Sequence, residues 1–302
     1  MAESNARSRP DWVDDDLFPF ESLFIEIDGQ VVHYIDEGAG PVLLFLHGNP
    51  TWSFLFRDVI RALRSDFRCI AMDYPGFGLS TPANGYRYLP EEHAAVVAGF
   101  LDALGLTGVT LVGQDWGGPI GLAAAQARPG VVERLVLANT WAWPVNGDLH
   151  FEAFGRIVGG FAMRFLNRRL NLLVRAFIPT GHRRRKVTPA EMGQYSRALD
   201  TPDRRQASAV LPGRVLGSRA FFVSVEAGLA NLRNLPTLIV WGDADIAFRT
   251  QELRRLEREF PEHETVIIEG AGTYVESDAP EEFVAAVAGW MAAHPPGSGR
   301  PS

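Results

Sequence analysis

The chain has 302 residues, of which 46% are hydrophobic and 22% are charged, and its formal net charge is −7. These values are typical of a globular protein with one large core, and the negative charge argues against a general nucleic-acid binder. The single cysteine, Cys69, excludes an internal disulfide and any zinc site built from cysteines. It lies in an apolar run, so we expect a buried thiol.

The N-terminal segment is polar and acidic, and no basic region followed by an apolar one is present. This pattern predicts no signal peptide, and no apolar run is long enough to span a bilayer. We therefore expect a cytoplasmic protein with neither nucleic acid nor membrane among its partners. Residues 295–302 are rich in proline, glycine and serine and are predicted to form a disordered tail.

Short apolar runs alternate with helical patterns along most of the chain. Strands are predicted at Leu23–Ile27, Val31–Ile35, Val42–Leu46, Cys69–Met72, Val109–Val112, Leu135–Ala138, Thr237–Trp241 and Thr265–Ile268. Helices are predicted at Ser53–Leu63, Glu91–Leu104, Pro119–Arg128, Thr250–Glu259 and Glu281–Ala293. The first two strands form a predicted hairpin. The remaining alternation is typical of a doubly wound α/β fold with a mostly parallel sheet.

Residues 142–230 break this alternation, since they contain amphipathic helical segments and no convincing parallel strand. We predict a helical cap here, inserted into an α/β core formed by residues 1–141 and 231–294. Most aromatic side chains of the cap are expected to be packing residues, with a few lining a pocket between cap and core. The basic cluster Arg183–Lys186 is predicted to be a solvated helix end and not an anion site.

The segment Gly113-Gln114-Asp115-Trp116-Gly117-Gly118 joins a predicted strand to a predicted helix. Small residues on both sides of a central reactive one are typical of a nucleophile elbow, a strained turn that projects one side chain above the sheet. The projected residue here is Asp115. A carboxylate indicates alkyl transfer to an aspartate, and the lack of a serine at this point disfavours a serine esterase.

Two further polar segments follow predicted strands. The first is His47-Gly48-Asn49-Pro50, and the second is Trp241-Gly242-Asp243-Ala244-Asp245. In an open parallel sheet, the loops at the carboxyl ends of the strands meet in one crevice. We therefore expect these two segments to converge with Asp115.

Together the three segments resemble the haloalkane dehalogenases of the α/β-hydrolase superfamily, and the similarity covers nearly the whole chain outside its tails. The resemblance implies an α/β-hydrolase fold with an eight-stranded, mostly parallel sheet and an inserted cap, and an enzyme without metal or cofactor. It implies that Asp115 attacks the carbon of a small apolar halide. The Asn49 amide and the Trp116 indole N–H would bind the departing halide, and the backbone N–H groups of these two residues would form the oxyanion hole.

The resemblance also assigns Asp245 as the acid that orients the catalytic base. Some dehalogenases place this acid after the sixth strand, where this chain has Asn139, which is not a carboxylate. Asp243 is the competitor, but it lies earlier in the turn and is better explained as a turn residue.

The chain departs from the family at the base itself. The family has a histidine after Gly-Ala-Gly, whereas this chain has Thr273 after Gly270-Ala271-Gly272. A hydroxyl has no useful proton affinity near neutral pH, so Thr273 cannot act as an ordinary general base. Five of the seven histidines map to the scaffold, and we do not expect His150 or His182 of the cap to reach the site. Halide displacement is therefore predicted to proceed while hydrolysis of the resulting ester is impaired.

Two other functions remain open. An epoxide hydrolase also uses an aspartate nucleophile, but it needs acidic hydroxyls in the cap, and residues 142–230 contain one tyrosine, Tyr195. A non-catalytic binding protein that has lost its base would keep the pocket. The run Gly76-x-Gly78-x-Ser80 lacks the lysine of a phosphate-binding loop and is interpreted as a turn.

Overall fold

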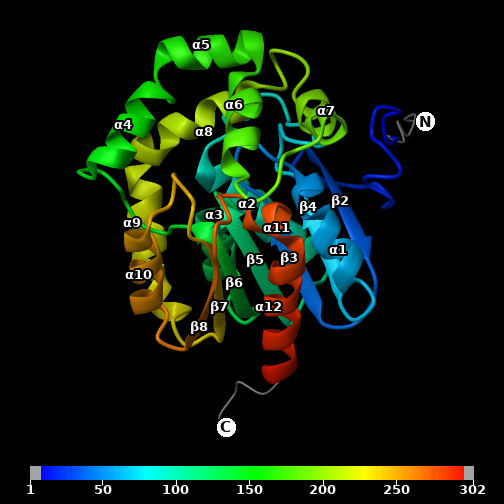
Figure 1. The fold of residues 1–302 in the computed structure, drawn as a ribbon, viewed down its shortest axis with the longest axis vertical. Helices are drawn as coiled ribbons and strands as arrows, with labels where there is room; N and C mark the ends of the chain where they lie inside the picture. Colours follow the sequence, from blue (N-terminus) through cyan, green and yellow to red (C-terminus); the bar gives the residue numbers. More distant parts are fainter. Residues whose placement is uncertain (1–7, 296–302) are drawn as a thin grey trace.

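A computed structural model describes residues 8–295, so residues 296–302 of the predicted tail lie outside the described part. One sheet runs through the centre of the molecule (Figure 1). Its strands are β1 (Leu23–Ile27), β2 (Gln30–Glu37), β3 (Val42–Leu46), β4 (Arg68–Met72), β5 (Val109–Asp115), β6 (Val132–Thr140), β7 (Thr237–Gly242) and β8 (His263–Ile268). Their spatial order is β1-β2-β4-β3-β5-β6-β7-β8. The pairs β1–β2 and β2–β4 are antiparallel and the other pairs are parallel, which confirms the predicted hairpin and the mostly parallel sheet.

Strand β3 illustrates why the sheet is covered on both faces. Its side chains alternate between two apolar clusters, with Leu44 and Leu46 in one and Leu43 and Phe45 in the other. Helices α2 (Pro90–Ala103), α3 (Gly117–Ala127) and α10 (Thr250–Glu259) contribute to the first cluster. The second contains side chains from the short 3-10 helix η1 (Ser53–Phe56) and from helices α1 (Arg57–Leu63), α11 (Val275–Asp278) and α12 (Pro280–Ala293). A strand that is apolar on both sides thus needs a helical layer on each.

The chain between β6 and β7 contains helices joined by loops and no strand. It forms α4 (Leu149–Ile157), α5 (Phe161–Leu170), α6 (Leu172–Gly181), α7 (Pro189–Ala198), α8 (Gln206–Gly217), α9 (Arg219–Gly228) and the short 3-10 helix η2 (Leu229–Asn231). Helices α4 to α8 lie above the upper end of the sheet, whereas α9 descends beside α3 (Figure 1). The carboxyl ends of the parallel strands therefore lie beneath a helical roof.

Two aromatic side chains depart from the expected packing of the cap. Phe161 and Phe165 do not pack in its interior, because no other element of residues 8–295 covers α5, and their side chains are 88% and 51% exposed. The basic cluster at 183–186 follows the end of α6, and the side chains of Arg183, Arg184 and Lys186 are exposed, as expected of a solvated helix end. Its backbone is held in addition, because the N–H groups of Arg183, Arg184 and Arg185 all donate to the carboxylate of Asp278.

Candidate active site

Asp115 is the last residue of β5 and stands at the turn into α3. Its backbone has a φ of +49°, a left-handed conformation that L residues rarely adopt. Gly117 makes the turn possible, because a Cβ at this position would lie 2.0 Å from the carbonyl oxygen of Leu46 on β3. The close approach of the α3 start to β3 leaves the Asp115 side chain above the edge of the sheet, as expected of a nucleophile elbow.

The Asp115 carboxylate is partly accessible from a cavity and otherwise enclosed by protein. The backbone N–H of Asn49 donates to its Oδ2 at 2.8 Å. Burial raises the pKa of Asp115 to about 7, although the backbone N–H groups of Asn49 and Trp116 lower it, and the nearby charge of Asp245 raises it further. A carboxylate with this pKa is half ionised near neutral pH, and two N–H groups stabilise its charge.

Asn49 and Trp116 both line the cavity beside Asp115. The Asn49 side chain makes one long hydrogen bond, from Nδ2 to the Ser208 carbonyl at 3.4 Å, and the Trp116 indole N–H makes none among residues 8–295. His47 fixes the loop that carries Asn49, since its Nδ1 donates to the Gly48 carbonyl at 2.8 Å and its Nε2 accepts from the backbone N–H of Tyr74. Two N–H donors are thus available to an anion next to Asp115.

Asp245 and Thr273 are in direct contact. The Thr273 hydroxyl donates to Asp245 Oδ1 at 2.6 Å. Asn139 donates from Nδ2 to Asp245 Oδ2 at 2.8 Å, and the backbone N–H of Ala247 donates to Oδ1 at 2.7 Å. Burial raises the pKa of Asp245. The contact between Asn139 and Asp245 could not be predicted from the sequence, because the two residues are 106 positions apart.

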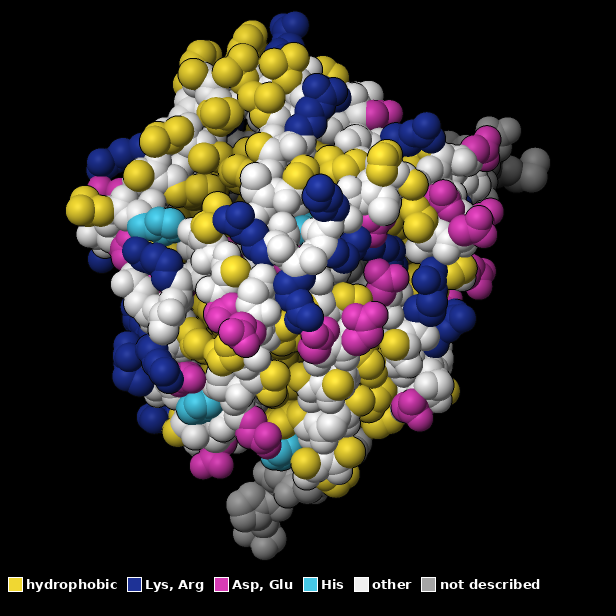
Figure 2. Space-filling view, in the orientation of Figure 1, with side chains coloured by type: hydrophobic (Ala, Val, Ile, Leu, Met, Phe, Trp, Pro, Cys, Tyr) yellow, Lys and Arg dark blue, Asp and Glu magenta, His cyan; other side chains and the backbone are white. Residues whose placement is uncertain are grey.

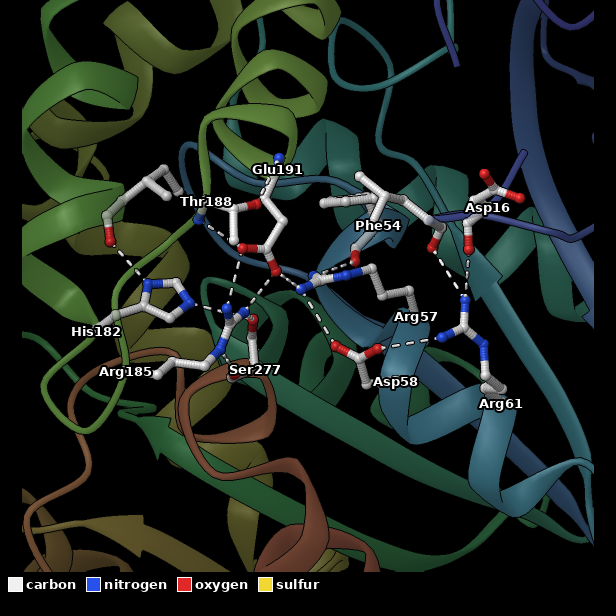
Figure 3. A network of polar contacts seen from close by, with 12 residues as sticks. Asp16, Phe54, Arg57, Asp58, Arg61, His182, Arg185, Thr188, Glu191 and Ser277 are labelled. Carbon is white, nitrogen blue, oxygen red and sulfur yellow. Dashed lines mark hydrogen bonds and ion pairs between the residues drawn. The ribbon is translucent and has the colours of Figure 1, made fainter. Parts of the chain in front are cut away.

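Helix α11, which follows Thr273 in the chain, is tied to the cap through Ser277 (Figure 3). His182 and Arg185 converge on the hydroxyl of Ser277, at 3.1 Å and 2.9 Å. Arg185 also contacts Glu191, which pairs in turn with the buried Arg57. This charged network links helix α11, and with it the chain just after Thr273, to the cap.

His150 and His182 have different positions, and the expectation that neither reaches the site is wrong for His150. It lines the cavity, and its Nε2 donates to the Ala247 carbonyl at 3.1 Å. His182 does not line it, because its Nδ1 donates to the Ile178 carbonyl and its Nε2 is used by Ser277. Burial lowers the pKa of His182 to about 4. Asp148 caps the N-terminus of α4, and an aspartate in this position is a sequence signal for the start of a helix. That signal does not predict that the His150 ring points into the cavity.

The cavity has a volume of about 270 Å³ and a mostly aromatic and aliphatic lining, which includes Asn49, Asp115, Trp116, His150 and Thr273. Tyr274 also lines it, and burial raises the pKa of this phenol well above its usual value, so Tyr274 is a poor acid. A larger cavity of about 620 Å³ lies by the start of β6 and contains none of these groups. Within residues 8–295, no cluster of three or more His, Cys, Asp or Glu side chains could hold a metal ion.

Comparison with known proteins agrees with this fold. The family model described as alpha/beta hydrolase fold matches residues 41–278, from the start of β3 to the end of α11. The chain is 41% identical over 276 residues to haloalkane dehalogenase 2 of Mycobacterium tuberculosis, which covers 91% of this chain and 96% of that protein. The chain is thus an α/β hydrolase.

Two further similarities are to members of different enzyme classes. The crystal structure of a putative ancestral haloalkane dehalogenase matches with a TM-score of 0.80 at 26% identity, over 90% of this chain and 98% of that chain. The cis-3-alkyl-4-alkyloxetan-2-one decarboxylase of Shewanella oneidensis is 28% identical over 288 residues, which cover 92% of this chain and 90% of that protein. Given the higher identity to the mycobacterial enzyme, the chain belongs to the haloalkane dehalogenase family, as its motifs predicted.

Proposed function

We propose that this protein cleaves the carbon–halogen bond of small haloalkanes through an alkyl ester on Asp115, and that hydrolysis of this ester is slow because Thr273 replaces the base. The observation that carries the proposal is the Asp115 carboxylate, enclosed by protein except at an apolar cavity, with the unused Trp116 indole N–H and the weakly bonded Asn49 side-chain amide beside it. Relatives at 41% identity that are named haloalkane dehalogenases support the reaction class.

The first step is an in-line displacement at the carbon that bears the halogen. An ionised Asp115 oxygen forms the new C–O bond, and the electrons of the C–X bond leave with the halide. The halide accepts hydrogen bonds from the Asn49 side-chain amide and the Trp116 indole N–H, both of which line the cavity. In a site with few polar neighbours these neutral donors stabilise the developing charge without an ion pair.

The second step adds water to the ester carbonyl. The backbone N–H groups of Asn49 and Trp116, which already face the Asp115 carboxylate, would stabilise the resulting oxyanion. A base must remove a proton from the water, and Thr273 instead donates its own proton to Asp245. Loss of general-base catalysis slows such a step by roughly 10²–10⁴-fold. The ester therefore accumulates.

Exposure of the protein to 1-bromobutane, followed by intact mass and bromide measurement, tests the proposal. We expect one bromide per protein and a mass increase of one butyl group, whereas Thr273→His should release bromide steadily without a lasting mass shift. Asp115→Asn, a matched control of nearly the same size, should show neither. Sustained bromide release with an unshifted mass in the unmodified protein would contradict the impaired second step.

The two alternatives predict different products. Tyr195 is buried and does not line the cavity, so the cap offers no tyrosine to protonate an epoxide oxygen. Diol formation from a 1,2-epoxyalkane without bromide release would nevertheless favour an epoxide hydrolase. Persistent inactivity of Thr273→His would favour a binding role. A cis-3,4-dialkyloxetan-2-one serves as a further substrate, because the Shewanella relative is named for decarboxylating one.

A further inference from the structure

Helix α5 lies across one end of the molecule with almost nothing packed above it (Figure 1). Of its ten residues only Asn167 is buried, and this side chain anchors the helix by donating to Ser208 Oγ and accepting from the Leu173 N–H. Six apolar side chains of α4 and α5 face outward, and we call them the cap patch: Leu149 (83% exposed), Ile157 (65%), Phe161 (88%), Phe165 (51%), Leu166 (40%) and Leu170 (47%). Clustered apolar exposure of this kind marks a contact surface.

Positive charge accompanies the cap patch. From residue 149 to residue 175 the chain has five arginines and one acidic residue. Arg156 and Arg168 have acidic partners, but Arg164, Arg169 and Arg175 have none within residues 8–295. Figure 2 shows hydrophobic and basic side chains together at this end of the molecule, whereas most acidic side chains in that view lie farther down.

The charge asymmetry extends over the whole cap. Residues 142–230 carry fourteen basic and six acidic side chains, a formal charge of +8, whereas the rest of the chain carries fifteen basic and thirty acidic side chains, a formal charge of −15. A protein of negative net charge thus presents a strongly positive end, and the exposed apolar side chains lie on that end. An anionic partner would be attracted to this end and repelled by the opposite one.

Helix α5 carries phenylalanine and leucine side chains beside arginines that lack an acidic partner. This pattern is typical of helices that lie in the interface of an anionic bilayer. We propose that the cap patch docks this protein on the surface of a membrane rich in anionic lipids. No helix among residues 8–295 is long and apolar enough to cross a membrane, so the contact would be peripheral. The expectation of no membrane partner rested on the lack of such a span and does not bear on surface docking.

A second copy of the chain fits the cap patch less well. A two-fold symmetric contact would bring each patch against itself, so Arg164 and Arg169 of one copy would face the arginines of the other. Like charges across an interface oppose association. The phosphate groups of anionic lipids supply the complementary charge, and their acyl chains accept Phe161 and Phe165.

Helix α4 connects the cap patch to the cavity. Phe151, Phe154 and Val158 of this region line the cavity, while Leu149 and Ile157 belong to the patch. Docking would bring this wall of the cavity close to the lipid bilayer, in which apolar haloalkanes concentrate. The benefit to substrate capture rests on the proposed function, but membrane binding itself does not, so the two can fail independently.

Co-sedimentation with vesicles tests the docking. We expect the protein to bind mixed phosphatidylcholine–phosphatidylglycerol vesicles, to bind pure phosphatidylcholine vesicles at least about tenfold more weakly, and to detach as salt is raised. Phe161→Ser with Phe165→Ser should reduce binding by about tenfold or more, because two buried apolar side chains are lost. Arg164→Gln with Arg169→Gln should weaken binding to the anionic vesicles alone.

Control variants distinguish docking through the cap patch from non-specific hydrophobic binding. Val223→Ser and Ile267→Ser remove side chains that are 41% and 48% exposed outside the cap patch, and they should bind as the unmodified protein does. Circular dichroism of every variant checks that it is folded. Absence of binding to anionic vesicles would overturn the proposal. So would light scattering that shows self-association abolished by the two Phe→Ser changes, since a second copy would then occupy the patch.

Discussion

The pKa of Asp115 determines how the first chemical step depends on pH. Burial holds this pKa at about 7, so the acid loses its proton only as the pH rises through neutrality. The ionised fraction is about 10% at pH 6 and about 90% at pH 8, from the definition of the pKa. Because only the carboxylate attacks carbon, we expect the rate of ester formation to rise about tenfold over this interval.

Single-turnover mass spectrometry measures this rate directly. The protein is mixed with excess 1-bromobutane at fixed pH values, quenched at short times, and the fraction that carries a butyl group is followed. Under the proposed function hydrolysis of the ester is slow, so the signal would report the first step alone. Asp245→Asn should move the midpoint to lower pH, because the charge of Asp245 raises the pKa of Asp115.

Glu276 is the group to control for in this profile. It is fully buried, its carboxyl oxygens have no hydrogen-bond partner, and burial raises its pKa to about 8. A Glu276→Gln variant should keep the midpoint near 7. A profile that is flat between pH 6 and pH 8, or a rate that falls with rising pH, would refute the assignment of a buried Asp115 carboxylate as the nucleophile.

Four further substitutions have defined outcomes. Asn49→Ala and Trp116→Phe should each slow the bromide burst by about 10²–10³-fold, measured by rapid quench, because one halide donor is lost; unchanged bursts would exclude these donors. Gly117→Ala should lower the thermal midpoint by several degrees, since its Cβ would clash with the Leu46 carbonyl; an unaltered midpoint would contradict the described turn. Glu276→Gln should stabilise the protein at pH 9 by as much as ~5 kcal/mol in urea unfolding, and little at pH 4. The folded protein favours the neutral form of Glu276, so the unmodified protein loses stability as the pH rises from about 4.5 through 8. Equal stability of the unmodified protein and the Glu276→Gln variant at pH 9 would argue against a buried, unpaired acid at this position.

The sequence alone determined the scaffold and the elbow. Each predicted strand is found with its bounds shifted by at most a few residues, because a continuous apolar run between turn residues needs no distant information to be identified. The glycines around Asp115 likewise point to a strained turn through local sterics. Asn49 and Asp245 could be placed near Asp115 because loops at the carboxyl ends of parallel strands share one edge. Trp116 is the next residue in the chain, and Thr273 was placed there by the resemblance to the haloalkane dehalogenases.

Only the tertiary structure decided which side chains meet across the chain. Asn139 holds Asp245 from 106 positions away, and His150 reaches the cavity through its contact with Ala247. Neither contact follows from helical or strand periodicity. Periodicity predicts on which face of an element a side chain lies, but not which distant residue packs against that face. Phe161 shows the same limit for an apolar residue that was expected to be buried. Its apolarity predicted burial, and its exposure arises because no other element of the described chain covers α5.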